Sequence, residues 1–538
     1  MALRRRDRVR TQTQIDILLT DVRELRVATP RPGIARRIEL FVEREWVLVA
    51  VSALFLASSA IAARAWMTAD GWFDIVYARE IVQHGFLHGD TLTIMGQGHA
   101  WVDQQWLGQL VLYAFFVLGG PKLTVLATAF VYSLAFALAL ALARRRGASA
   151  LAMTLVGLLV WLYATTWVQT EAFSHVLFVV VLSLLAGESR RRSRRILLVF
   201  PLLVLWANLH GAVVLGAGLV ALLGAVELWH LLRAKRAARL ALLRAMGLLV
   251  VPWLCVFATP YGFSVAQYYH ATILNPAFHD YLGPWMPPTP FTVVGGPFFL
   301  LALGAIVVVA RRYRQLTAYE LAVLAVTVAG ALEAQRAIMW FGFACLLFLP
   351  PLVERGDGRR IRTPSARIRL GFAAAALVLL VGALAEAFSR PQSYYLRAFP
   401  NRASTVVADY VRAHHGARVF ATDRFSDWLV YEQPSLWGKV AYDARWEELT
   451  PTQIRDVFFF THQYGEDWER PARGYRLLVI APEEQPWLVR TFERRQNMRV
   501  LYRGPKAIVF ERTSSPRAAP TSSNACGDVT SRTRCRSM

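Results

Sequence analysis

The densest group of side chains able to exchange protons lies between the first two long apolar segments. The stretch from Trp66 to Gln105 carries Asp70, Asp74, His84, His88, Asp90, His99 and Asp103. Residues 46–65, which precede it, are apolar enough to cross a bilayer. Ionisable side chains next to a membrane are costly, and a carboxylate held there can serve as a general base. This pattern favours an enzyme that acts on a lipid-linked substrate at the membrane face.

The composition is that of a polytopic membrane protein. Of the 538 residues, 55% are hydrophobic and only 18% are charged, fewer than in a soluble protein of this size. The formal net charge of +23 comes from short arginine clusters between apolar runs, which is typical of cytoplasmic loops and argues against a nucleic-acid partner. Two cysteines lie in apolar runs and two in a polar tail, without metal-ligand spacing.

Apolar runs predict a bundle of eleven membrane spans, near 46–65, 121–143, 149–167, 172–187, 196–209, 212–232, 245–259, 292–310, 316–333, 337–353 and 370–388. With the N-terminus inside, arginine clusters fall on the inner side at 144–146, 190–195, 233–244, 311–314 and 355–369. The polar residues near span ends then gather outside, where the first loop lies: Glu171, Asn208, His210, Tyr261, Asp280 and Arg336. Such a gathering is typical of a site, although polar residues collect at any water interface.

The first outer loop is expected to hold two helices in the membrane interface. Phe73 to His84 reads as a short surface helix that ends before Gly85. Trp106 to Leu118 is apolar but too short to cross, and it ends in Gly119-Gly120-Pro121. If it crossed, every later arginine cluster would move to the outer side.

After the last span the chain changes character. Strand-length apolar runs at 418–421, 439–442, 476–481, 499–502 and 507–511 alternate with helical stretches at 404–413, 451–462 and 483–495. These predict a small α/β domain. The chain therefore divides into a cytoplasmic Arg-rich segment (1–45), a membrane domain (46–390), an extracytoplasmic α/β domain (391–512) and a disordered tail (513–538).

Several motifs carry a family resemblance over residues 46–512. They are Asp70-Gly71-Trp72-Phe73, His99-Ala100-Trp101-Val102-Asp103, Leu205-Trp206-Ala207-Asn208-Leu209-His210-Gly211, Thr259-Pro260-Tyr261-Gly262, and Arg336 at the start of a late span. With them the chain resembles the GT-C glycosyltransferases, multi-pass enzymes of the membrane. Within that superfamily it looks closest to a group of largely uncharacterised bacterial proteins with a C-terminal α/β domain.

The resemblance implies transfer of a sugar, with inversion, from a polyprenyl-phosphate donor to an envelope glycan, lipid or protein, at the outer face of the bacterial inner membrane. It makes Asp70 the base, with Asp103 as the second catalytic candidate. Arg336 would meet the donor phosphate. The remaining candidates for substrate contact are His210, Asp74, His99, Glu171 and Trp101. A divalent metal is known in this superfamily, but no acidic doublet accompanies Asp70 here, and no cofactor is assigned.

Each of these residues also has a purely structural interpretation. Asp70 can cap the helix that follows it, and Asp103 can anchor the second interfacial helix by accepting an indole hydrogen bond. Arg336 can pair with Glu333, and His210 can fix its loop. At the level of the protein, the alternatives are a catalytically inactive scaffold in envelope assembly and, less favoured, a transporter, for which no inverted repeat is evident.

Overall fold

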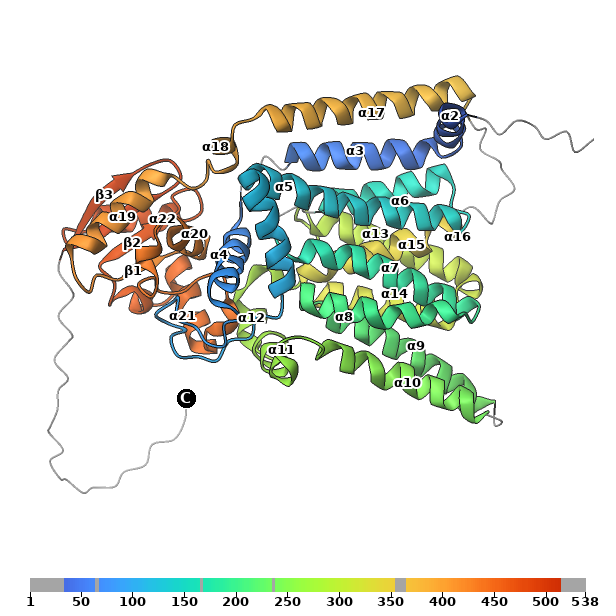
Figure 1. Ribbon diagram of the computed structural model, residues 1–538, viewed down its shortest axis with the longest axis horizontal. Helices are drawn as coiled ribbons and strands as arrows, with labels where there is room; N and C mark the ends of the chain where they lie inside the picture. The colour runs from blue at the N-terminus through green and yellow to red at the C-terminus, as the bar shows by residue number, and fades with distance from the viewer. Residues whose placement is uncertain (1–32, 63–66, 165–167, 235–237, 354–363, 514–538) are drawn as a thin grey trace, which may run out of the picture.

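The computed structural model describes residues 33–62, 67–164, 168–234, 238–353 and 364–513. Predictions for the segment before residue 33, for part of the inner arginine clusters and for the tail after 513 lie outside these residues. The described chain forms a long helical bundle with a smaller α/β domain at one end (Figure 1).

The bundle is built from residues before 390. Its helices are α2 (Ile34–Arg44), α3 (Trp46–Ala62), α4 (Ala69–His84), α5 (Trp106–Arg145), α6 (Ala150–Tyr163), α7 (Glu171–Arg190), α8 (Val199–Leu209), α9 (Val213–Arg233), α10 (Arg239–Val256), α11 (Val265–Ile273), α12 (Pro276–Tyr281), α13 (Gly295–Arg312), α14 (Ala318–Glu333), α15 (Ile338–Phe348), α16 (Pro350–Val353) and α17 (Ala366–Ser389). Short 3-10 turns join some of them, including η3 (Gly283–Trp285) and η5 (Gln335–Ala337).

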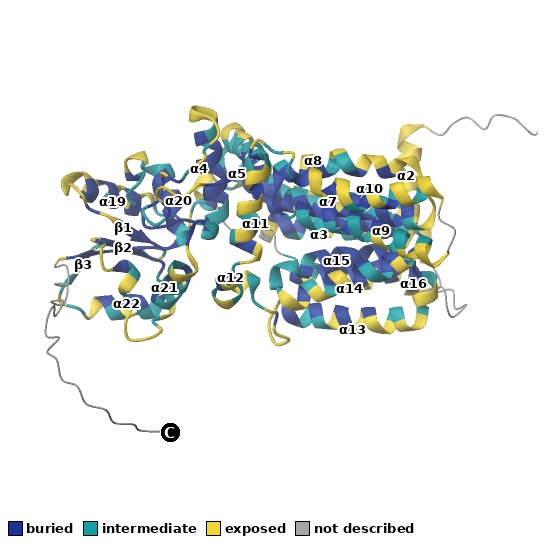
Figure 2. Ribbon diagram, turned by 90° about the horizontal axis from the view of Figure 1, so that it is seen from below, coloured by how far each residue is buried: buried dark blue, intermediate teal, exposed yellow. Residues whose placement is uncertain are grey.

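The helices have the lengths and surfaces expected in a membrane. Within the described residues, α5, α7, α9, α10, α13 and α17 are long and apolar enough to cross, while α3, α6 and α15 are shorter apolar helices. Large apolar side chains such as Leu254, Leu300 and Ile306 are exposed on α10 and α13, whose outer sides carry many exposed positions (Figure 2). Apolar side chains are stable there only if lipid covers them. These features support a multi-pass protein, and the count of eleven spans stays a prediction.

Arginine side chains pair with buried acids at the end of the bundle far from the α/β domain. Arg146 and Arg190 both bind Glu320, which is fully buried and also belongs to the capping box that starts α14. Arg244 bridges Glu188 at 2.7 Å and Glu227 at 2.8 Å. These inward pairs hold the bundle together at one end and leave the other end for the polar residues of the first loop.

The structure changes two expectations for the first loop. The helix predicted at 73–84 begins earlier, at Ala69, and it is not a surface helix, because Trp72, Ile75 and Val76 are fully buried. The α/β domain covers it, through packing between α4 and α20 (Asp423–Glu432). The segment after Trp106 continues as α5, but Gly120 has a φ of 67° and breaks the helix at the predicted Gly-Gly-Pro sequence.

The α/β domain contains one mixed sheet, in the strand order β1-β2-β4-β3. Strands β1 (Val419–Ala421) and β2 (Leu477–Ile480) are parallel, whereas β4 (Ile508–Arg512) runs antiparallel to β2 and to β3 (Met498–Arg503). Helices α19 (Asn401–Ala413), α20, α21 (Pro451–His462) and α22 (Pro486–Glu493) surround it, with the 3-10 turn η7 (Trp446–Glu448). The short helix α18 (Gln392–Tyr395) packs on α5 where the chain enters this domain.

Four of the five predicted strand segments are confirmed, and the fifth is wrong. Residues 439–442 form no named strand, because Val440 makes only isolated bridges to Thr93 and Val419. The first loop takes the place of a neighbouring strand there: the N–H of Ile94 donates to Val440 and that of Met95 to Ala441. The loop and the α/β domain are therefore joined through their backbones.

Candidate functional site

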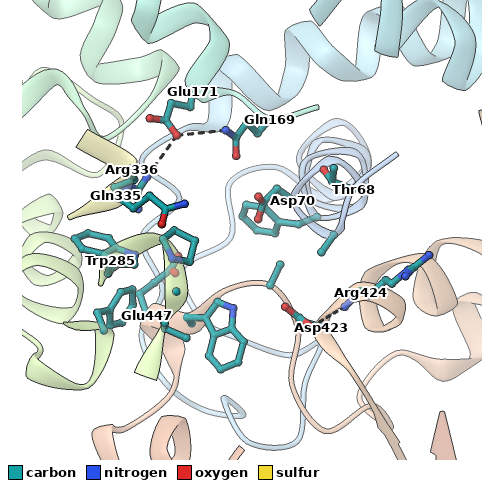
Figure 3. A pocket seen from close by; sticks show the side chains of 18 of the residues that line it. Thr68, Asp70, Gln169, Glu171, Trp285, Gln335, Arg336, Asp423, Arg424 and Glu447 are labelled. Atoms are coloured by element: carbon teal, nitrogen blue, oxygen red, sulfur yellow. Dashed lines mark hydrogen bonds and ion pairs between the residues drawn. The ribbon is translucent and has the colours of Figure 1, made fainter. Parts of the chain in front are cut away.

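A cavity of about 780 Å³ lies where the helical bundle, the first loop and the α/β domain meet. Its lining includes Asp70 and Asp74 of α4 together with Glu171, His210 and Arg336 from the bundle. These five were predicted from the sequence as site residues, although they are spread over more than 260 positions of the chain. Figure 3 shows Glu171 and Arg336 on one side of the cavity, Asp423 and Arg424 on the other, and Asp70 between them.

The start of α4 is fixed by Thr68, which leaves the Asp70 side chain free to face the cavity. The Thr68 side chain accepts the N–H of Gly71 and donates to the carbonyl of Val168, so Thr68 is the N-cap. The suggestion that Asp70 caps the helix is therefore wrong. A Cβ at Gly71 would lie 3.0 Å from Val168 Cγ1, so the glycine allows α4 to approach the loop that Thr68 binds.

The surroundings of Asp70 favour its protonated form. Burial raises the pKa of Asp70 to about 6, and the nearby charge of Asp423 raises it further, while the guanidinium of Arg336 opposes the shift. One turn later on the same face, Asp74 is 1% exposed. Burial and the charge of Asp70 raise the pKa of Asp74 well above its usual range, despite the nearby backbone of Thr170. Asp70 is thus the member of this pair that loses its proton near neutral pH.

Arg336 is held at the bundle wall by a turn and an ion pair. It lies in η5, where the N–H of Gln335 donates to the carbonyl of Met286. The guanidinium is 3.6 Å from Glu171 Oε2 and covers the ring of Trp285 at 4.5 Å. Glu333 pairs with His279 instead, at 3.4 Å, so the proposed Arg336–Glu333 pair is wrong. About a third of the Arg336 side chain stays exposed, enough to meet an anionic group in the cavity.

His210 is tied to the loop between α8 and α9. Its Nδ1 accepts the N–H of Ala212 at 3.1 Å, which fits the structural interpretation of this residue. Because His210 also lines the cavity, its Nε2 edge is the part left for a ligand. Asn208 lies nearby but is occupied, since its side chain accepts from Trp106 Nε1 and donates to two carbonyls.

The α/β domain supplies cavity residues that sequence reasoning missed: Asp423, Arg424, Tyr442, Trp446, Glu447, Glu484 and Gln485. Asp423 begins α20 directly after β1, and Glu484 follows β2. The carboxyl ends of adjacent parallel strands are the usual place for ligand-binding residues, so an acid after each predicted strand was an available signal. Burial raises the pKa of Asp423 to about 6 and that of Glu447 to about 7.

The other predicted residues of the first loop, His99, Trp101 and Asp103, are not among those that line the cavity. Trp101 packs on Arg445, and His99 Nδ1 lies 3.0 Å from the carbonyl of Glu448. Asp103 accepts the N–H of Gln105, while its Oδ2 has no hydrogen-bond partner among the described residues. The indole of Trp106 binds Asn208, so the expected indole bond to Asp103 is not formed by that ring.

A buried ion cluster explains why the loop residues His99, Trp101 and Asp103 do not line the cavity. The side chain of Arg445 is fully buried and its Nη2 lies 2.8 Å from Asp90 and 2.8 Å from Asp443. The guanidinium lies over the rings of Tyr77 and Trp101, at 4.5 and 4.8 Å from their centroids. The cluster joins α4, the loop and the α/β domain at a point adjacent to Trp446 and Glu447 in sequence.

The acids of the cavity do not form a metal centre. No group of three or more His, Cys, Asp or Glu side chains in the described residues is placed to hold a metal ion. Asp70 and Asp74 share a helix face and are the two acids that α4 brings to the cavity. The chemistry available is that of a carboxylate base, a guanidinium and aromatic surfaces.

Comparison with known proteins finds no matching family model and no matching curated protein. Among solved structures, the Archaeoglobus fulgidus oligosaccharyltransferase in the apo form is similar over 82% of this chain and 70% of its own, with 12% identity and a TM-score of 0.45. The complex of AglB from that organism with an inhibitory peptide and a dolichol-phosphate matches over 84% and 70%, with 11% identity and a TM-score of 0.45.

The structure of ArnT from Cupriavidus metallidurans in the apo state is also similar to this chain. The alignment covers 89% of this chain and 98% of the ArnT chain, with 15% identity and a TM-score of 0.43. At TM-scores below 0.5 these likenesses carry no conclusion about substrate or reaction.

Proposed function

We propose that this protein is a membrane glycosyltransferase that moves a sugar from a polyprenyl-phosphate donor to an acceptor in the cell envelope. The observation that supports this most strongly is that Asp70 and Arg336 line one cavity at the end of an apolar helical bundle. A base and a phosphate-binding cation are the minimal set for this reaction. Asp70 ionises near pH 6, so it can accept a proton at neutral pH.

In the proposed reaction Asp70 takes the proton of an acceptor hydroxyl as its oxygen attacks the anomeric carbon of the donor. The new carbon–oxygen bond forms as the bond from that carbon to the phosphate oxygen breaks, and the lipid phosphate leaves with the electron pair. Arg336 binds the departing phosphate, whose charge it neutralises. A single displacement of this kind inverts the anomeric configuration.

The same proposal includes the topology expected from the arginine clusters. The protein lies in the bacterial inner membrane with its N-terminus inside, and the cavity opens on the outer side. Two observations support it. Arg146, Arg190 and Arg244 form their ion pairs at the bundle end away from the α/β domain, and the cavity is lined by residues of that domain.

The test is a comparison of lipids and glycans from a deletion strain complemented with wild type, with Asp70→Asn or with Asp409→Asn. Asp409 is an exposed acid on α19 that pairs with Arg412, so it controls for loss of one negative charge. We expect one glycoconjugate to lack a sugar in the deletion strain and to regain it with wild type and Asp409→Asn. Loss of the base should lower transfer by roughly 10²- to 10⁴-fold.

Two outcomes would contradict the proposal. If no glycoconjugate changes on deletion, the protein is not a transferase. If Asp70→Asn restores the sugar as well as wild type, Asp70 is not the base, and the scaffold interpretation gains support. Equal amounts of each variant in the membrane fraction are required in both cases.

A further inference from the structure

The two walls of the cavity differ in charge. The bundle wall presents Arg336 and its partner Glu171, with Trp285 beneath the guanidinium. The wall from the α/β domain presents three acids, Asp423, Glu447 and Glu484, and one cation, Arg424. That guanidinium pairs with Glu484 and lies over the rings of Phe399 and Phe425, and its charge partly offsets that of Asp423, so this wall still holds more acids than cations.

The acidic wall also holds a buried polar atom without a partner. Gln485 is 6% exposed and lines the cavity, and its Oε1 has no hydrogen-bond partner among the described residues. Leaving a buried amide oxygen unpaired costs about 1–3 kcal/mol, so such an atom points to a ligand that donates a hydrogen bond there. Gln485 follows β2, at the same sheet edge as Asp423 after β1.

Aromatic rings lie next to these acceptors. Trp446 and Tyr442 both line the cavity, with ring centroids 5.6 Å apart. Flat apolar rings beside hydrogen-bond acceptors match a molecule with apolar C–H faces and hydroxyl edges. A sugar has both. An acceptor bearing phosphate or carboxylate groups would instead meet Asp423 and Glu447 at close range, and like charges repel strongly in a cavity of low dielectric.

We propose that the α/β-domain wall of the cavity, made of Asp423, Tyr442, Trp446, Glu447 and Gln485, binds the acceptor, and that the acceptor presents a hydroxyl-rich carbohydrate without acidic groups. This inference rests on the proposed transferase function and narrows its acceptor class. The phosphate of the donor meets Arg336 on the bundle wall, the acceptor sugar meets the acidic wall, and Asp70 lies between them to take the hydroxyl proton (Figure 3).

The test uses purified full-length protein and saturation-transfer NMR, which detects weak sugar binding. The probes are maltotetraose and mannotetraose as neutral sugars, and tetragalacturonate as an anionic sugar of equal length. We expect signal from at least one neutral probe and none from tetragalacturonate. Trp446→Ala and Asp423→Asn should each weaken the neutral signal about tenfold, the effect of removing a hydrogen bond to a charged group or a comparable contact.

Matched controls lie on the same domain outside the cavity lining. Trp437→Ala removes another indole, and Glu483→Gln removes an exposed acid that pairs with Lys506. Both should bind the neutral probe as wild type does. Intrinsic tryptophan emission and the protease pattern will show whether either site variant has lost its fold. In that case Gln485→Leu replaces the unfolded variant, because this change keeps the side-chain volume and removes the unpaired acceptor.

The outcomes separate this inference from the proposed function. Absence of signal from both neutral probes, equal binding of tetragalacturonate, or an unchanged signal in Trp446→Ala each overturns the inference, even if Asp70→Asn abolishes transfer. Conversely, the deletion strain could show no change while the purified protein binds a neutral sugar through Trp446. The carbohydrate site would then stand, and the proposed transferase function would fail.

Discussion

The two halves of the first loop look alike in sequence and differ in the structure. The proximal half, α4 (Ala69–His84), carries Asp70 and Asp74 on one face that lines the cavity. The distal half, residues 88–103, is equally rich in acids and histidines, but it is joined to the α/β domain by backbone hydrogen bonds and by the buried pair of Arg445 and Asp90. One half presents its ionisable groups to a cavity, and the other uses them to fix two parts of the protein together.

The difference teaches that a dense run of ionisable residues does not by itself locate a site. A buried acid with a guanidinium against it, such as Asp90, has its charge satisfied and is positioned for structure. An acid that lines a cavity, such as Asp70, keeps its charge available for a substrate. The following predictions test whether the two halves divide in this way.

The largest expected effect is a loss of stability in Arg445→Met. This change removes the arginine of the α/β domain that binds Asp90 of the distal half. The change leaves Asp90 and Asp443 buried without a counter-ion, which should cost about 3–5 kcal/mol. Limited proteolysis of the linker between α17 and α19 measures the detachment of the α/β domain. Arg412→Met, an exposed arginine on α19, is the control and should resist protease as wild type does. Wild-type resistance in Arg445→Met would show that the distal half is not an anchor.

The next prediction separates Asp70 from Asp103 by pH. A base acts only when ionised, and burial raises the pKa of Asp70 to about 6, so transfer should fall about tenfold per pH unit below 6 and stay level above it. Burial raises the pKa of Asp103 to about 8. If Asp103 were the base, the rate of sugar transfer in isolated membranes would keep rising up to about pH 8, and that result would reverse the roles of the two halves.

A smaller effect, on the free energy of unfolding, is expected from substitutions of Asp103. At pH 7 its carboxyl is protonated, because its pKa is raised to about 8, and Oδ1 accepts the N–H of Gln105. Asp103→Asn keeps that acceptor and should leave stability and transfer nearly unchanged, whereas Asp103→Ala should cost about 1 kcal/mol. Loss of transfer in a stable Asp103→Asn protein would place the distal half in the reaction.

The smallest effect should come from Asp74→Asn in the proximal half. Burial raises the pKa of Asp74 well above its usual range, which favours the protonated form, and asparagine matches that form in shape and charge. Transfer should change by less than about twofold. The same assay on Asp70→Asn, one turn away, provides the contrast, and an equal loss in both variants would mean that the two acids act as one unit.

Periodicity and charge were enough to predict the apolar bundle, the break near Gly120 and most of the α/β domain, because these follow from local patterns. They also selected Asp70 and Arg336, since ionisable residues beside a membrane are few. They did not predict α20 or the contribution of Asp423, because its role depends on how a separate domain docks. The burial of α4 was missed for the same reason: the surface that covers Trp72 comes from residues beyond 390.

The union of the first loop with the α/β domain also has a consequence for biosynthesis. Tyr77 donates to Asp443, a partner 366 residues later in the chain. At roughly 5–20 residues per second, the ribosome needs about 20–70 s to make the intervening chain. During that interval α4 lacks its cover, and Trp72 and its neighbours lie exposed at the membrane surface. The half-made protein is therefore a client for chaperones or for the lipid interface itself, and truncation before residue 443 yields a chain that cannot close its own site.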